Sequence, residues 1–106
     1  MNVNEYGGMT AEKVKEAQTL EEAIHKWGNE AQVKMLLEEM AELQKEICKF
    51  WRGKDNTEDI ADEVADVEIM LAQIKMIFGI EEAVDRHRAA KIHRLQNRLR
   101  GLPDDR

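Results

Sequence analysis

Two long stretches of this chain carry apolar residues at helical spacing, and only a short turn separates them. The turn, residues 52–56, contains Gly53, a residue type that commonly follows the end of a helix. Two amphipathic helices joined so closely must pack as antiparallel neighbours, so the pattern predicts a helical hairpin over about 30–51 and 57–78. The apolar stripes consist of Val33, Leu36, Leu37, Met40, Leu43, Ile47, Phe50 and Trp51, and of Ile60, Val64, Val67, Leu71, Ile74 and Phe78.

Shorter helical patterns flank this hairpin. Thr10 is a suitable N-cap for a helix over about 11–27, Asn29 for the helix at 30, and Asp55 or Asn56 for the helix at 57. A fourth helix is predicted over about 81–100, stopped by Gly101 to Pro103.

The length of 106 residues and the lack of strand-like alternation favour a single all-α domain over 1–106. We expect a four-helix bundle-like fold, with a loose leader at 1–9 and a tail at 101–106. Its thin apolar stripes leave surface that a monomer would expose, which predicts a homodimer or homotetramer.

Charge and cysteine content limit the class of protein. The net charge of −6 argues against a general nucleic-acid or membrane-surface binder. A single cysteine, Cys48, fits a reducing compartment, and the sequence has neither a signal-like stretch nor a membrane-length apolar run. These features predict a soluble cytoplasmic protein.

Four acids of the hairpin are spaced to share helix faces. Glu39 and Glu42 are three residues apart on one helix, as are Glu63 and Asp66 on the next, and the turn places both pairs at similar height. With Met40 and Ile60 taken as stripe centres, Glu39 falls about 100° off centre and Glu63 about 60°, inside the apolar arc. Such carboxylates need a compensating partner, and all-oxygen ligation favours Mg²⁺, with Mn²⁺ as a substitute.

The alternative is purely structural. The acids could form surface ion pairs within their helices, or they could face the basic last helix. Residues 38–68 hold eleven acids and four bases, whereas residues 81–100 hold three acids and six bases. This asymmetry suits either helices that pair by charge or a polyanion held by metal ions and flanking cations.

The acid pattern also resembles a known family. The run Leu37-Glu38-Glu39-Met40-Ala41-Glu42-Leu43 is followed by Glu63-Val64-Ala65-Asp66-Val67, with twenty residues (43–62) between Glu42 and Glu63. This pattern is similar to the motif of MazG-type nucleoside triphosphate pyrophosphohydrolases. These enzymes belong to the all-α NTP pyrophosphatase superfamily. The resemblance covers about residues 20–77 and implies Mg²⁺-dependent cleavage of an NTP or dNTP to the monophosphate and pyrophosphate.

The resemblance also implies residue roles. Glu39, Glu42, Glu63 and Asp66 match the family's metal ligands, and Glu38 matches the first acid of the motif, an additional ligand or a base that orients water. Some family members carry a lysine where this chain has Asp59. We therefore seek the phosphate-binding cations in the last helix, at Lys91, Arg94 and Arg98.

A nucleobase pocket is the remaining expectation. Trp27, Asn29 and Gln32 precede or begin the motif helix, and either Trp27 or Trp51 offers a stacking surface. Two other functions stay open: a non-catalytic helical interaction module, and a degenerate family member that binds nucleotide without turnover.

Overall fold

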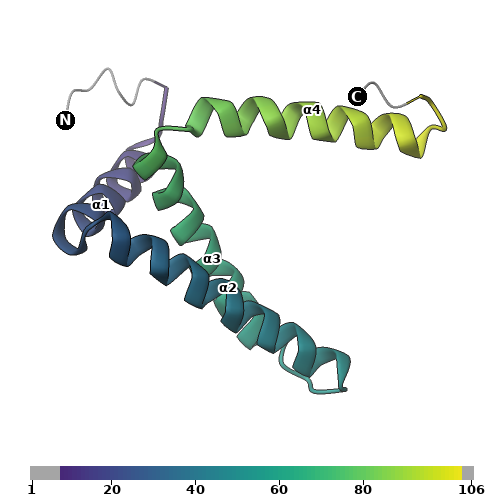
Figure 1. Cartoon of the computed structure of the whole chain (residues 1–106), viewed down its shortest axis with the longest axis horizontal. Helices are drawn as coiled ribbons and strands as arrows, with labels where there is room; N and C mark the ends of the chain where they lie inside the picture. Colours follow the sequence, from purple (N-terminus) through teal and green to yellow (C-terminus); the bar gives the residue numbers. More distant parts are fainter. Residues whose placement is uncertain (1–7, 104–106) are drawn as a thin grey trace.

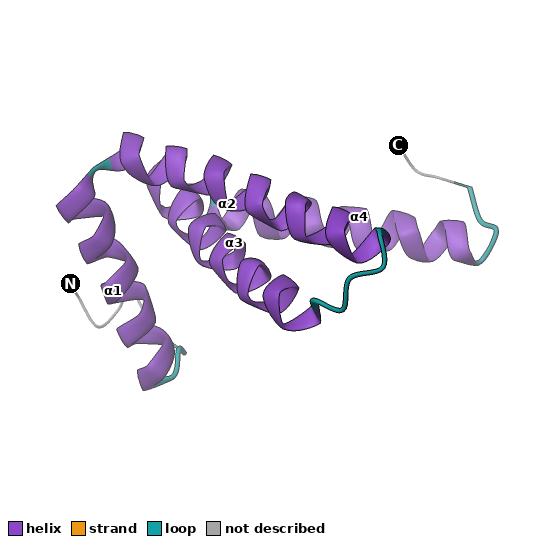
Figure 2. Cartoon of the chain, turned by 90° about the horizontal axis from the view of Figure 1, so that it is seen from below, coloured by secondary structure: helices purple, strands orange, loops and turns teal. Residues whose placement is uncertain are grey.

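The computed structural model describes residues 8–103, which form four helices and no strand. The helices are α1 (Ala11–Trp27), α2 (Asn29–Trp51), α3 (Thr57–Phe78) and α4 (Glu81–Leu99). Helices α2 and α3 form the predicted antiparallel hairpin, α1 lies against its open end, and α4 projects away (Figure 1; Figure 2). The all-α prediction is confirmed. Most of the predicted leader and tail, residues 1–7 and 104–106, lies outside the described residues.

Local signals set the helix ends. Thr10 caps α1 as predicted, because its Oγ1 accepts a hydrogen bond from the Lys13 N–H at 3.2 Å. The predicted cap at Asn29 is wrong: Asn29 is the first residue of α2, and Gly28 is the cap. Gly28 has a positive φ of 88°, which ends α1 and turns the chain into α2 without steric strain.

The hairpin turn is fixed by a contact between the two helices. Asn56 precedes α3, but its side chain makes no capping bond to that helix. Instead Asn56 Nδ2 donates to the Glu46 carbonyl oxygen at 2.9 Å and to Glu46 Oε1 at 3.2 Å. Lys49 Nζ, 2.9 Å from Glu46 Oε2, and the Asn56 amide together lower the pKa of Glu46. The base of α3 is therefore tied to α2.

This tie sets the register of the whole hairpin. Seven residues are two helical turns, so the position seven before Glu46 and the position seven after Asn56 lie at equal distance from the tie. Those positions are Glu39 and Glu63. The acids of the two helices are thus placed opposite each other by one polar contact near the turn.

The interior of the hairpin is unusually polar. Met70 is the only buried apolar side chain of the described residues, whereas Gln32, Glu46, Asn56 and Gln73 are all buried. Polar groups contribute little net stability on burial, even when hydrogen-bonded. The other apolar side chains between α2 and α3 are partly buried at most, so the hairpin gains less hydrophobic stabilisation than full burial would give.

Helix α4 does not complete a bundle within the chain. Gly79 takes the left-handed conformation, with φ of 63°, and α4 leaves the end of α3 with none of its residues buried. Ile92, Leu95 and Leu99 remain exposed on it. The Cα radius of gyration is 17.4 Å, against about 13 Å for a compact domain of this length. The expected four-helix packing is therefore not formed by one chain alone.

None of the helices within the described residues combines the length and the apolarity that a membrane crossing requires.

Replacement of Asn56 tests the hairpin tie. Asn56→Ala leaves the buried Glu46 carbonyl without its donor, so the free energy of unfolding should fall by about 1–3 kcal/mol. Urea denaturation at fixed protein concentration measures the loss. Asn29→Ala removes an exposed side chain of the same type and should cost less than about 0.5 kcal/mol. Equal losses in both variants would contradict the role given to Asn56.

Candidate metal centre

Three carboxylates meet in the middle of the hairpin. Glu39 comes from α2, and Glu63 and Asp66 come from successive turns of α3. One oxygen of each lies within 4.8 Å of the others, and all three residues are partly buried. No other group of three or more His, Cys, Asp or Glu side chains gathers this closely within residues 8–103. We call these residues the acid trio.

Glu39 holds its proton more tightly than an ordinary glutamate. Partial burial, the Asp66 charge and the adjoining Glu63 carboxyl raise the pKa of Glu39 to about 7. Glu63 Oε2 is also buried and accepts no hydrogen bond from the described residues. Like charges held together with an unsatisfied oxygen are costly unless a proton or a cation compensates them.

The donor set fits a hard divalent cation. All three groups are carboxylates, and no histidine or cysteine belongs to the trio. Mg²⁺ and Mn²⁺ prefer such oxygen ligands, and Mg²⁺ usually keeps water or phosphate oxygens in its remaining positions. Glu39, Glu63 and Asp66 could therefore hold Mg²⁺ while leaving coordination positions for a substrate.

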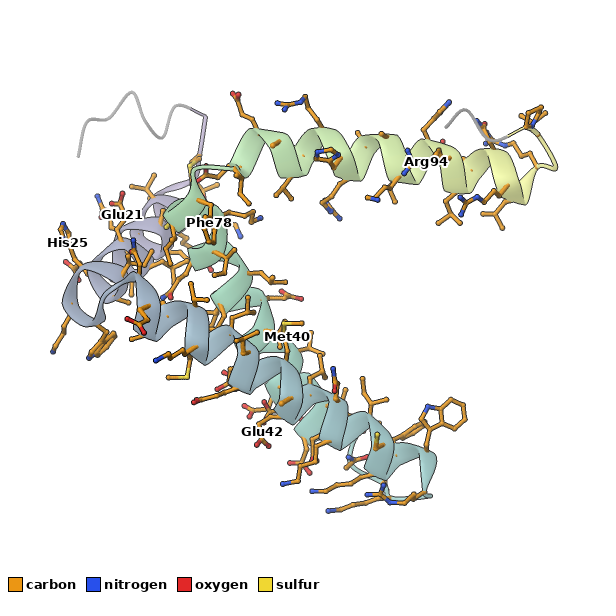
Figure 3. All side chains as sticks on the ribbon, in the orientation of Figure 1. Glu21, His25, Met40, Glu42, Phe78 and Arg94 are labelled. Atoms are coloured by element: carbon orange, nitrogen blue, oxygen red, sulfur yellow. The ribbon has the colours of Figure 1, made fainter. Side chains whose placement is uncertain are left out.

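The other two motif acids lie outside the trio. Glu38 and Glu42 are exposed on α2, and Glu42 points outward from the hairpin (Figure 3). Glu42 follows Glu39 by three residues, so its backbone position is one turn away on the same side of the helix. The structure thus brings together three of the four predicted ligands and leaves Glu42 adjacent to them.

The residues predicted for nucleobase binding are divided among several places. Asn29 lines an open groove of about 1040 Å³ between the α1–α2 corner and the end of α3, together with His25 and Ile77. Gln32 is buried, and Trp27 is exposed with Lys26 Nζ 5.4 Å from its ring centroid. Trp51 is 81% exposed at the tip of the hairpin, so it does not join the groove.

The predicted phosphate-binding cations are placed on the projecting helix. Lys91, Arg94 and Arg98 belong to α4, which leaves the end of α3 (Figure 3 labels Arg94). The acid trio lies near the middle of the hairpin. Within one chain, the structure does not bring these cations to the trio.

Sequence reasoning missed one buried polar residue. Gln73 is 3% exposed, and its Oε1 has no hydrogen-bond partner among the described residues. The available signal was a polar residue within the apolar second half of α3, but it lacked the motif context of the acids.

Comparison of the chain with protein-family models, with curated proteins and with solved structures gave no match.

The raised pKa of Glu39 predicts a pH-dependent stability of the metal-free protein. Folded Glu39 keeps its proton up to about pH 7, whereas the unfolded carboxyl loses it near 4.5. The contribution of Glu39 to the free energy of unfolding is therefore fully present below pH 4.5 and is lost as the pH rises through about 7. In EDTA, the urea concentration at the unfolding midpoint should decrease as the pH is raised from 5.5 to 8. The decrease should be smaller in Glu39→Gln.

The comparison of the two proteins isolates this group. Glu46 has a lowered pKa, so it is ionised in both folded and unfolded states across that range and adds no slope. Identical pH slopes for the wild type and Glu39→Gln would show that Glu39 ionises normally.

Mg²⁺ should stabilise the folded chain through the trio. A ligand that binds only the folded state raises the melting temperature as its concentration rises. Glu63→Gln removes one ligand and should abolish most of that rise. Glu68→Gln makes the same change at an exposed site on the same helix, and this variant should retain the Mg²⁺-dependent rise in melting temperature. A melting temperature that ignores Mg²⁺ in the wild type would contradict a metal centre here.

Proposed function

We propose that this chain is a Mg²⁺-dependent nucleoside triphosphate pyrophosphohydrolase of the MazG-like type, acting in the cytoplasm on an NTP or dNTP. The observation that carries the proposal is the acid trio, three carboxylates from two helices with one buried oxygen left unsatisfied. The motif resemblance in the sequence supports the same reaction. Mn²⁺ would substitute for Mg²⁺ because it has similar oxygen preferences.

The chemistry follows from the charges involved. A triphosphate is an anion and is repelled by an acidic hairpin unless a cation lies between them. Bound Mg²⁺ would neutralise phosphate charge and favour in-line attack by water. The carboxylates of Glu39, Glu63 and Asp66 would hold that ion. Glu38, the residue before Glu39, and Glu42, one turn after it, are the exposed motif acids of α2 that could orient a water.

The groove at the α1–α2 corner is the candidate nucleoside site. Its apolar lining consists of Ile24, Met76 and Ile77, and its polar or charged lining consists of Gln18, Glu21, Glu22, His25, Lys26 and Asn29. The apolar side chains would contact a base, and the polar ones would hydrogen-bond to its edges. Contact of Lys91, Arg94 or Arg98 with phosphate at the trio would require α4 from another copy, or a different placement of α4.

An interaction module is the second candidate function, and one observation favours it. Large apolar side chains are exposed along α2 and α3, as expected for a surface that binds another helix. This candidate needs no metal. A degenerate nucleotide-binding protein is a third reading, which predicts binding with Mg²⁺ but no product.

Pyrophosphate release decides among these readings. The purified chain is incubated with canonical and modified NTPs and dNTPs in Mg²⁺, in Mn²⁺ and in EDTA. We expect release that requires the metal and favours one nucleotide. Glu63→Gln should lower turnover by at least about 100-fold, since outer contacts to a metal ligand alone are worth 10- to 100-fold.

The control is again Glu68→Gln, which should turn over at the wild-type rate. Circular dichroism must show that both variants remain helical. Full activity of Glu63→Gln would remove the trio from the mechanism. No release by the folded wild type would refute the enzyme, and a Mg²⁺-dependent thermal shift with nucleotide would then indicate the degenerate protein.

A further inference from the structure

A buried glutamine lies between the acid trio and the groove at the α1–α2 corner. Gln73 follows Asp66 by seven residues, which is two helical turns along the same side of α3. Met76 and Ile77, which line the groove, come one turn later on the same helix. Along α3 the order is therefore acid trio, Gln73 and groove.

Helix α2 repeats this order in the opposite chain direction. Gln32 precedes Glu39 by seven residues, and Asn29, which lines the groove, precedes Gln32 by three. Because Glu39 and Asp66 meet in the trio, an equal step of seven residues along each antiparallel helix places Gln32 at the height of Gln73. Two buried amides therefore lie at one level of the hairpin.

The Gln73 side chain has an acceptor without a donor. It is 3% exposed, and its Oε1 accepts no hydrogen bond from the described residues. Two other buried side-chain oxygens share this state, and each belongs to a group with a role: Asn56 Oδ1 to the amide that ties the hairpin, and Glu63 Oε2 to the acid trio. An unpaired buried acceptor costs free energy, so Gln73 calls for a donor from outside the described residues.

The order along the hairpin matches the order of groups in a nucleotide. Phosphates at the acid trio and a base in the groove would leave the pentose between them, at the level of Gln73. A pentose presents hydroxyl groups, which donate hydrogen bonds, whereas ionised phosphate oxygens only accept them. The glutamine side chain is long and flexible, so its amide can extend toward the next turn of α3, where Met76 and Ile77 form the groove wall.

We propose that Gln73 is a specificity-determining residue that recognises a hydroxyl group of the pentose, with its Oε1 as the acceptor. The substrate class is then a nucleoside triphosphate whose sugar carries that hydroxyl, and sugars that lack it are poor substrates. The inference rests on the proposed function, because that function places the phosphates at the acid trio and the base in the groove.

Four triphosphates of the favoured base test this contact. They are the ribonucleotide, its 2′-deoxy form, its 3′-deoxy form and its 2′,3′-dideoxy form, and kcat/KM for pyrophosphate release is measured for each with Mg²⁺. We expect the wild type to lose at least about 10-fold on the dideoxy form, the effect of one missing hydrogen bond to a buried group. The monodeoxy form that shares the loss identifies the hydroxyl.

A single substitution separates recognition from structure. Gln73→Met keeps the length of the side chain and removes its amide, so its kcat/KM should be nearly equal for all four triphosphates. On the dideoxy form this variant should be at least as active as the wild type, because that substrate never made the contact. Gln44→Met makes the same change at an exposed glutamine of α2 and should keep the discrimination of the wild type.

Three results would overturn the inference. They are equal kcat/KM of the wild type for all four triphosphates, undiminished discrimination by Gln73→Met, and a loss in Gln73→Met that is the same factor for every substrate. The first result needs only the wild type, so it remains decisive should the variant unfold. All three leave the proposed function standing, since pyrophosphate is still released. No release from any triphosphate would instead refute the function, and this inference with it.

Discussion

The hydrogen bonds from Asn56 to Glu46 are the constraint on which the rest of the hairpin depends. They join α2 to the start of α3 at a buried point, with Nδ2 2.9 Å from the backbone oxygen and 3.2 Å from the side-chain oxygen. From that point both helices run for two turns before they reach Glu39 and Glu63. A helix rises by a fixed amount per residue, so one fixed contact determines which residues of α2 and α3 lie opposite each other along the hairpin. The acid trio is therefore assembled by register and needs no contact of its own to align it.

That register gives the hairpin an unusually polar interior. The acid trio and the buried amides of Gln32 and Gln73 lie there, while several large apolar side chains remain exposed on α2 and α3. Met70 is the one buried apolar side chain of the described residues, and others such as Leu36 and Leu43 are partly buried. Compensation of the interior charges would therefore add to a modest stability that the hairpin gains from its own packing. The proposed cation would supply compensation that the isolated chain lacks.

The polar interior and the exposed apolar side chains explain what the sequence could and could not predict. Periodicity, glycines and Thr10 placed all four helices to within a residue, because these signals act locally. The stripe centre assumed for α2 was misplaced, since Met40 is 41% exposed and the inward-facing Glu39 and Glu46 lie about 100° around the helix from the positions that follow them. A stripe indicates that a surface is covered but does not say by which chain. Asn56 occupies the N-cap position of α3, one of the two that the sequence predicted, but its side chain bonds to a residue ten positions earlier and not to α3.

Metal binding and self-association would act on the same folding equilibrium from different parts of the hairpin. A cation between Glu39, Glu63 and Asp66 would remove repulsion that opposes the pairing of α2 and α3. The homo-oligomer that the sequence predicts would bury apolar residues of α2 and α3 that are exposed in one chain. The unfolded chain offers neither the aligned acids nor the aligned apolar residues. By linkage each would therefore strengthen the other through the shared register, without any change of shape at either site.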